Sequence, residues 1–548
     1  MPTTADVVVR ALEEAGIRHV FGYPGGQNMR FIEAMEGSAV EFVLVTHEGA
    51  AGFMADVCAR LTGRPGACVS TLGPGATNLA TGVGNAFLDR VPVLAFTGKM
   101  GRKWRGRTVQ MQVDHQAIFA PLTKWTAELD AATAGETMRQ AIRFAEAEQP
   151  GPVHLDFPED VAEEGSERYE GSGKYEGSEN HEGSEKYEGS GKYEGSERLE
   201  RSLEAAEAAL RAARYPLVAI GLTMNRAGAT DALRAFVERH NLPVVCTMMA
   251  KGHVPEAGGH FVGVVGRARR DIVAEFCRPA DLVLAVGYDP VEFNYEDWVR
   301  KDVPIVHIDT VPADLAATHS LAGNVVGDIR HSLERLAAIA PLRHEWDMGS
   351  LPAHRRRLAE ALQPSQENFA PHHVVVAMRE ALVEDGILAV DVGAHTHLAA
   401  QLWDPRGPGH LLVSNGWSSM GFGIPAAIAA KIALPERQVV ACVGDGGYLM
   451  MVGEINTAVR LNLPVVFVVL RDRYLSLIRV KQTRRRFAWS GVQLYGDTYR
   501  PSDTLFGAPV VVAETETAFR LAFAQALAAS GPVVIEAVVD PSEYDGLI

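Results

Sequence analysis

The chain has 548 residues and a formal net charge of −16, from 68 acidic and 52 basic side chains. This length predicts about three domains with large buried cores, and the acidic balance disfavours binding to nucleic acid or to an anionic membrane surface. No apolar run is long enough to span a membrane, and the N-terminus predicts an amphipathic helix, not a signal peptide. The five cysteines occur singly in apolar surroundings, which indicates buried thiols in a reducing compartment, and we expect a cytoplasmic protein.

Residues 1–162 alternate between helical and extended patterns. They predict a helix over 4–15, strands at 19–22, 41–45, 67–71 and 91–97, and helices of small residues between the later strands. This alternation is typical of a doubly wound parallel sheet. Polar or glycine-rich turns at 23–26, 46–48 and 72–78 follow three of these strands. We expect them at the sheet edge where α/β folds bind ligands.

Residues 163–198 are six copies of a hexad such as YEGSGK or YEGSER. Glycine and serine recur in every copy and no apolar face is present, so the tract has nothing to offset the entropy of ordering. This composition favours a flexible linker over an interaction arm.

A central domain is predicted over 199–345, with strands at 216–220, 282–287 and 306–309. The turn 287–290, Gly-Tyr-Asp-Pro, could bind a nucleotide, and Asp309 stands where an acid could bind a ribose. No GxGxxG fingerprint precedes them, so a stabilising domain without a ligand fits as well. Residues 346–366 are predicted to be a second linker.

The last domain, 367–548, repeats the plan of the first. It predicts a helix over 371–384, a strand over 387–392 and a helix of small residues over 421–432. The unit at 437–482 then predicts a buried strand at 439–443, a Gly-Asp-Gly-Gly turn, one helix over 448–461 and a second strand at 465–470. The first and last domains look like diverged copies of one fold.

Asp445 and Asp472 follow the two strands of that unit. Because neighbouring parallel strands end at the same edge of a sheet, the two carboxylates could share a hard cation such as Mg²⁺. The glycines of the turn let the backbone approach a ligand, and a helix start binds phosphate. An ordinary strand-to-helix turn would explain Gly-Asp-Gly alone, but the spacing to Asp472 favours a metal-bound diphosphate.

Six motifs occur along the chain in a fixed order: FGYPGG, HEGAAGFMADVCARLTGRPG, LGPGATN, ADLVLAVGYDPVEF, SNGWSSMGFGIPAA and GDG…RDRYLSLIRVKQ. In these motifs the chain resembles the acetolactate synthase-like branch of the thiamin-diphosphate enzymes. The resemblance implies an α/β protein of three doubly wound parallel-sheet domains: a pyrimidine-binding domain, a central Rossmann-like domain and a diphosphate-binding domain. It implies thiamin diphosphate and Mg²⁺ as cofactors, and a homodimer or homotetramer with active sites between subunits. Typical flavin-binding features are not evident, so FAD is not predicted.

The resemblance also implies roles for individual residues. Glu48 matches the catalytic glutamate that hydrogen-bonds the aminopyrimidine ring, a general acid–base task. Met420 matches the apolar residue that supports the bent cofactor. Asp445, Asp472 and the Tyr474 carbonyl match the metal ligands, although Arg471 stands where the family usually has Asn. The other cofactor-binding positions are Pro24, Gly25, Pro74, Asn78, Val392, Gly393, His395, Ser418, Gly444, Gly446, Gly447, Leu477 and Ile478.

Substrate contacts are expected from Gln110, Gln112 and His115 in the first domain. Lys481 stands where the biosynthetic acetolactate synthases carry a tryptophan, and it could recognise an anionic acceptor. The expected reaction is decarboxylation of a 2-oxo acid with carboligation, such as pyruvate to 2-acetolactate. The alternatives are another branch member (a decarboxylase, lyase or acetyltransferase) and a non-catalytic cofactor-binding homologue.

Overall fold

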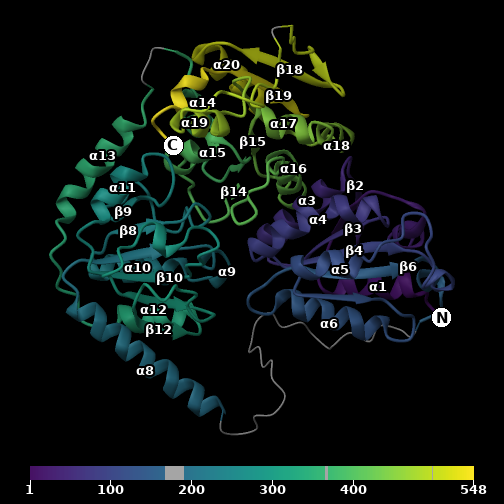
Figure 1. Cartoon of the computed structure of the whole chain (residues 1–548), viewed down its shortest axis with the longest axis horizontal. Coiled ribbons are helices and arrows are strands. Elements are labelled where there is room, and N and C mark those ends of the chain that lie inside the picture. The colour runs from purple at the N-terminus through teal and green to yellow at the C-terminus, as the bar shows by residue number, and fades with distance from the viewer. Residues whose placement is uncertain (167–190, 365–367, 497) are drawn as a thin grey trace.

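The computed structural model describes residues 1–166, 191–364, 368–496 and 498–548. In this part of the chain three α/β domains are present: the first at the right of Figure 1, the central one at the left and the third at the top. This confirms the predicted fold class. Most of the predicted hexad linker lies outside the described residues, and helix α8 (Gly191–Ala212) begins inside the tract and leads into the central domain. No described helix combines the length and the apolar character that a membrane crossing requires.

The sheets of the first and third domains have the same strand order. The first runs β2 (Glu41–Leu44), β1 (His19–Gly22), β3 (Gly66–Ser70), β4 (Val93–Lys99), β6 (Val153–Pro158), β5 (Trp125–Glu128). The third runs β14 (Leu411–Val413), β13 (Ile387–Val390), β15 (Val439–Gly444), β16 (Val465–Arg471), β19 (Val533–Val538), β18 (Ala508–Ala513), with a short antiparallel β17 (Thr504–Leu505) at its edge. The shared order supports the interpretation of the two domains as copies of one fold.

The central sheet is also parallel. It runs β12 (Leu321–Val326), β11 (Ile305–Asp309), β10 (Leu282–Val286), β7 (Pro216–Ile220), β8 (Val244–Cys246), β9 (Phe261–Val264). Its middle strands are fully buried apolar runs, because helices cover both faces of the sheet. Helix α13 (Leu351–Ala361) lies within residues 346–366, the predicted second linker.

Helices complete each domain. In the first they are α1 (Thr4–Glu14), α2 (Met29–Glu33), α3 (Glu48–Thr62), α4 (Pro74–Leu88), α5 (His115–Phe119), α6 (Ala134–Glu146) and α7 (Glu159–Glu163). In the central domain they are α9 (Met224–Ala227), α10 (Thr230–His240), α11 (Arg270–Cys277) and α12 (Ile329–Ala337), besides α8. In the third they are α14 (Pro371–Ala381), α15 (Ala394–Leu402), α16 (Gly423–Ala433), α17 (Asp445–Met451), α18 (Glu454–Arg460), α19 (Ser476–Arg484) and α20 (Glu516–Leu527).

The first and third domains share one hydrophobic core, built mainly on α3, α4 and α16, which lie together in Figure 1. The rings of Phe53 and Phe422 meet edge to face with their centroids 5.7 Å apart. Arg60 pairs with Asp56 and Asp89 and donates to the carbonyl of Val413 at 2.8 Å. The two domains are therefore joined by apolar packing and by a hydrogen bond from Arg60, which ion pairs within the first domain hold in place.

The prediction of a single helix over 448–461 is wrong. The segment forms two short helices, α17 and α18, that break at Val452 and Gly453. The reason is a contact distant in sequence: the carboxylate of Glu454, at the start of α18, accepts hydrogen bonds from the first domain.

Candidate active site

Asp445 and Asp472 follow β15 and β16, which are adjacent parallel strands. Both side chains are buried. Asp445 Oδ2 accepts the N–H groups of Asp472 at 2.8 Å and Arg473 at 2.6 Å, while its Oδ1 is buried without a hydrogen-bond partner among the described residues. Asp472 accepts from the Tyr474 N–H at 2.9 Å and the Ser476 hydroxyl at 2.7 Å. The prediction that these two carboxylates meet at one sheet edge therefore agrees with the geometry.

The electrostatics of this pair favour a cation. Burial raises the pKa of Asp445 to about 7, and the neighbouring carboxylate of Asp472 contributes to the shift. Burial likewise raises the pKa of Asp472 to about 6. Two buried carboxylates with one orphaned oxygen fit a divalent, oxygen-seeking cation. Within the described ranges no third His, Cys, Asp or Glu completes a metal cluster, so further ligands would have to be backbone carbonyls or ligand oxygens.

The glycine turn after β15 is packed tightly between two side chains. A Cβ at Gly446 would lie 2.4 Å from Met420 Cε, and a Cβ at Gly447 would lie 1.5 Å from Asp391 Oδ2. A side chain at Gly446 would displace Met420, and one at Gly447 would displace the buried Asp391, because real Cβ contacts are essentially never this short. Met420, the predicted cofactor support, is thus placed directly against the Gly-Asp-Gly turn.

Asp391 is a residue that the sequence interpretation missed. It is fully buried and accepts the N–H groups of Val392 at 2.8 Å and of Gly421 and Phe422 at 3.1 Å each. These bonds fix the turn that carries Met420. The signal available in the sequence was an acid directly after the apolar strand β13, the position that Asp445 has after β15.

His395 lies in α15 beside the same turn. Its ring is closer than 3.4 Å to the positions that a Cβ would take at Gly393 and Gly444. Burial lowers the pKa of His395 to about 4, so the ring is neutral near pH 7. Its Nε2 is buried without a partner among the described residues. It is therefore available to a ligand at the glycine turn.

Glu48 is the first residue of α3, and a three-residue connection, 45–47, joins it to β2. It is half-buried, and its Oε2 accepts a hydrogen bond from Asn78 Nδ2 at 3.0 Å. A Cβ at Gly25 would lie 2.5 Å from the Thr71 side chain, so the 23–26 turn packs against the start of the 72–78 loop. The structure thus brings three of the predicted first-domain motifs to one edge of the sheet; Pro24, Pro74 and Asn78 are solvent-exposed there.

The hydrogen bond of the Glu48 carboxylate is to Asn78, within the first domain. The first domain contacts the third domain beside Glu48 through Glu454. Its Oε1 accepts the Thr46 N–H at 2.8 Å, the Thr46 hydroxyl at 2.7 Å and the His47 N–H at 3.0 Å. Glu454 was missed from the sequence, although an isolated acid among the small and apolar residues of Val452–Val459 was a signal.

Comparison with known protein families agrees with this arrangement. Three models of the thiamine pyrophosphate (thiamin diphosphate) enzymes match in order: the N-terminal TPP binding domain at residues 2–118, the central domain at 203–336 and the C-terminal TPP binding domain at 391–537. The chain belongs to the thiamine pyrophosphate enzyme family. Glu48 lies in the first match, and Asp445 and Asp472 lie in the third.

Individual relatives of the chain belong to one branch of the thiamine pyrophosphate enzymes. The acetolactate synthase of Bacillus subtilis is 29% identical over 98% of this chain and 93% of its own length. The acetolactate synthase large subunit of Parasynechococcus marenigrum is 32% identical over 93% of this chain and 81% of its own. The acetolactate synthase isozyme 3 large subunit of Escherichia coli is 31% identical over 87% of this chain and 84% of its own length. The predicted resemblance to the acetolactate synthase-like branch is confirmed.

The predicted substrate residues have different surroundings. His115 is buried, whereas Gln110 is exposed and Gln112 is half-buried, with its Oε1 lacking a described partner. Lys481 is exposed on α19. Burial lowers the pKa of His397 to about 3, and the charges of Arg267, Lys481 and Arg270 contribute. Lys481 therefore belongs to a cationic cluster next to the third domain's α15.

The remaining predicted cofactor positions are Gly393, Ser418, Leu477 and Ile478. Gly393 donates its N–H to the Thr396 hydroxyl at 2.8 Å, and Ser418 has a left-handed backbone with φ of 52°. On α19, Leu477 is half-buried, and Ile478 is 43% exposed. An exposed isoleucine beside the metal-binding candidates leaves an apolar surface available for a ligand or a second subunit.

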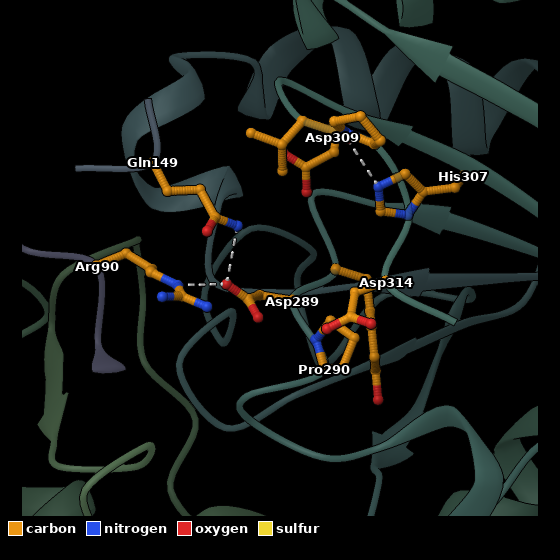
Figure 2. A pocket seen from close by; sticks show the side chains of 10 residues that line it. Arg90, Gln149, Asp289, Pro290, His307, Asp309 and Asp314 are labelled. Atoms are coloured by element: carbon orange, nitrogen blue, oxygen red, sulfur yellow. Dashed lines mark hydrogen bonds and ion pairs between the residues drawn. The ribbon is translucent and has the colours of Figure 1, made fainter. Parts of the chain in front are cut away.

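The central domain of this family member has a pocket of about 180 Å³ at its contact with the first domain (Figure 2). Asp289 Oδ2 accepts from Arg90 Nε at 2.8 Å and lies 3.5 Å from Gln149 Nε2. Asp309 lines the other side of the pocket, and its Oδ1 accepts the Thr310 N–H at 2.6 Å. The structure thus brings the 287–290 turn and Asp309 together at one pocket, and whether it binds a nucleotide stays a prediction.

Proposed function

We propose that the chain catalyses a thiamin-diphosphate- and Mg²⁺-dependent decarboxylation of a 2-oxo acid followed by carboligation, with pyruvate to 2-acetolactate as the leading reaction. The observation that carries this proposal is the buried pair of Asp445 and Asp472 against a glycine turn that also contacts Met420. Family membership and the printed names of the relatives support the same reaction.

The chain's own residues would share the work as follows. Asp445, Asp472 and the Tyr474 carbonyl would hold Mg²⁺, and His395 with the glycines of the turn would face the diphosphate. Bound thiamin diphosphate supplies a carbon nucleophile and an electron sink. Glu48 would exchange a proton with the pyrimidine ring as general acid and base. Asn78, which donates to Glu48 Oε2, would keep that carboxylate oriented.

The active site would be completed by a second copy of the chain, so a homodimer is the minimum, and a homotetramer fits equally. Support comes from α17, next to the glycine turn, where Leu449 is 45% exposed and Met450 58% exposed. Apolar side chains gathered at such a place are typical of a surface that a partner covers.

A second candidate reaction keeps the donor half and changes the acceptor. Arg267, Lys481 and Arg270 all lower the pKa of His397, so cationic charge is available near α15 for the carboxylate of a second 2-oxo acid or for a different anion. A different anionic acceptor in place of the second pyruvate would make the chain another member of the branch, such as a lyase or an acetyltransferase. FAD is not part of either proposal. All five cysteines are free thiols, which supports a reducing location such as the cytoplasm.

The proposal is tested with Glu48→Gln. We expect this variant to bind thiamin diphosphate and Mg²⁺ like the wild type, because the residues proposed to anchor the diphosphate lie in the third domain. Turnover of pyruvate should fall by about a hundredfold or more, the usual contribution of general acid–base catalysis. Glu36→Gln, an exposed glutamate of the same domain, is the control. Near-normal turnover in Glu48→Gln would contradict the proposed role.

A further inference from the structure

A buried polar network lies behind the loop that carries Asn78. Its members are His115, Thr97, His154 and Asp156, and each is at most 1% exposed. His115 Nδ1 is 2.9 Å from Asp156 Oδ1, and the Thr97 hydroxyl is 2.8 Å from both Asp156 Oδ1 and His154 Nε2. Lys99 Nζ reaches the second oxygen of Asp156 at 2.8 Å. Such a network fixes its members in one arrangement when every group has a partner.

The donor and acceptor roles follow from one contact at the surface of this network. The N–H of Gly73 donates to His115 Nε2 at 3.1 Å. Nε2 must therefore present its lone pair, so Nδ1 carries the proton and donates it to Asp156. Burial opposes the charge of Asp156, but hydrogen bonds from His115 and Lys99 hold its pKa well below the usual range. Asp156 is thus an acceptor that keeps His115 in this tautomer.

His154 completes the assignment. Burial lowers the pKa of His154 to about 4, so it is neutral near pH 7. Thr97 donates its hydroxyl proton to Asp156 and accepts from His154 Nε2; His154 Nδ1 then accepts from the Thr126 hydroxyl at 2.8 Å. Each of these groups has one consistent role, and the lone pair on His115 Nε2 is the one that accepts from the loop before α4.

The backbone conformation at Gly73 favours glycine. Its φ is +60°, and a Cβ there would lie 2.6 Å from the carbonyl oxygen of Met111, so the loop has little freedom to move toward residues 109–112. Gly73 precedes the first residue of α4, and its carbonyl accepts the Thr77 N–H at 3.0 Å. The next residue of this first turn, Asn78, donates to Glu48.

We propose that His115 is a positioning residue for Glu48, acting through the Gly73 N–H and the first turn of α4. This inference rests on the proposed function, since it assigns a task to Glu48. His115 itself contacts neither substrate nor cofactor in this account, because both of its ring nitrogens are engaged inside the first domain.

Two amide variants separate this role from simple filling of space. In His115→Gln the longer side chain can place its carbonyl oxygen where Nε2 was and accept the Gly73 N–H. In His115→Asn the shorter side chain can still donate to Asp156 but does not reach Gly73. His240→Gln is the matched control, because His240 is also buried and its Nδ1 accepts a backbone N–H, that of Leu342 at 3.3 Å, in the central domain.

The variants are compared by hydrogen exchange of the peptide covering 72–79 and by steady-state kinetics. In His115→Asn the Gly73 amide should exchange about tenfold faster or more. Its kcat should fall about 10- to 100-fold, the cost of a misplaced catalytic group, while the Kd for thiamin diphosphate stays within about threefold of the wild-type value. His115→Gln should recover most of the protection and of the kcat, and His240→Gln should change neither. Equal behaviour of the Gln and Asn variants in either readout would overturn the proposal.

One measurement on the wild-type protein is independent of whether the variants fold. In protein with ¹⁵N-labelled histidine, the His115 Nε2 resonance should show an unprotonated, hydrogen-bonded nitrogen at pH 7, and a protonated Nε2 would refute the assignment. The exchange and resonance data need no turnover. A wild-type protein that consumes no 2-oxo acid would therefore refute the proposed function and leave these data to decide the His115–Gly73 contact.

Discussion

Replacing Glu454 by alanine tests whether the third domain positions the catalytic edge of the first. The carboxylate is fully buried, and its Oε1 accepts three hydrogen bonds from Thr46 and His47, the two residues that precede Glu48. Its Oε2 accepts from the Thr457 hydroxyl at 2.7 Å. The variant removes all of these contacts at once.

The expected loss in unfolding free energy depends on whether each donor can find another acceptor after Glu454 is replaced. A hydrogen bond to a charged group contributes about 1.5–3 kcal/mol. Thr46 and His47 are exposed, so water can replace the lost acceptor there, whereas the Thr457 hydroxyl is buried and cannot recover. We therefore expect Glu454→Ala to lower the free energy of unfolding by about 2–4 kcal/mol, less than the sum of four charged bonds. The kcat should fall about tenfold or more, because α3 loses the contact that fixes its first residue.

The assay is urea denaturation together with steady-state turnover, with Glu454→Gln as the control. Glutamine keeps one oxygen to accept the three donors and can donate to Thr457, so it should lose about 1 kcal/mol or less. Thr46→Val in both backgrounds measures the coupling of one bond, which we expect to be about 1–2 kcal/mol. A Glu454→Ala variant within about 0.5 kcal/mol of the wild type, or an equal loss in the alanine and glutamine variants, would refute this reasoning.

Three further predictions concern the metal pair, the acceptor and acid stability. Asp445→Asn should raise the Mg²⁺ concentration that half-saturates cofactor binding by about a hundredfold, or about 2.7 kcal/mol. Without metal the same variant should have a higher melting temperature, because one of two adjacent buried charges is lost. Asp503→Asn, at an exposed residue, is the control. Lys481→Met should leave donor decarboxylation close to normal and weaken use of an anionic acceptor about ten- to a hundredfold; equal losses in both half-reactions, separated by stopped-flow and product assays, would contradict a role in acceptor choice. Burial lowers the pKa of His253 to about 4, below the unfolded value of about 6.5. The folded state therefore binds fewer protons at this residue, and its contribution to stability should fall by about 1.4 kcal/mol per pH unit as the pH drops from 6.5 toward 4. His253→Gln should flatten that slope in pH-dependent urea titrations, and an unchanged slope would show that this histidine is not its source.

Local patterns were enough to predict most of the fold. The strands His19–Gly22 and Pro216–Ile220 have the predicted bounds, because each is a short apolar run bounded by turn residues. The repeated order of the first and third sheets followed from motifs that recur at the same strand ends. Asp445 and Asp472 could be paired in advance, since parallel strands fix which residues meet at an edge.

What the sequence did not reveal depends on contacts between distant segments. The break between α17 and α18 is set by Thr46 and His47, which precede Glu454 by about four hundred residues. Asp391 accepts hydrogen bonds from Gly421 and Phe422, which follow it in the chain after α15 and β14, and Arg90 of the first domain pairs with Asp289 of the central domain. Propensity and periodicity describe neighbours along the chain, so they do not predict such pairs.

The central claim is decarboxylation coupled to carboligation, and the stoichiometry of the products tests it most directly. The purified chain with thiamin diphosphate, Mg²⁺ and pyruvate should release one CO₂ for each 2-acetolactate formed, measured together by NMR and CO₂ detection, and both should vanish when either cofactor is omitted. Formation of CO₂ with acetaldehyde and no carboligation product, or no consumption of pyruvate or any other 2-oxo acid in a panel, would contradict the account.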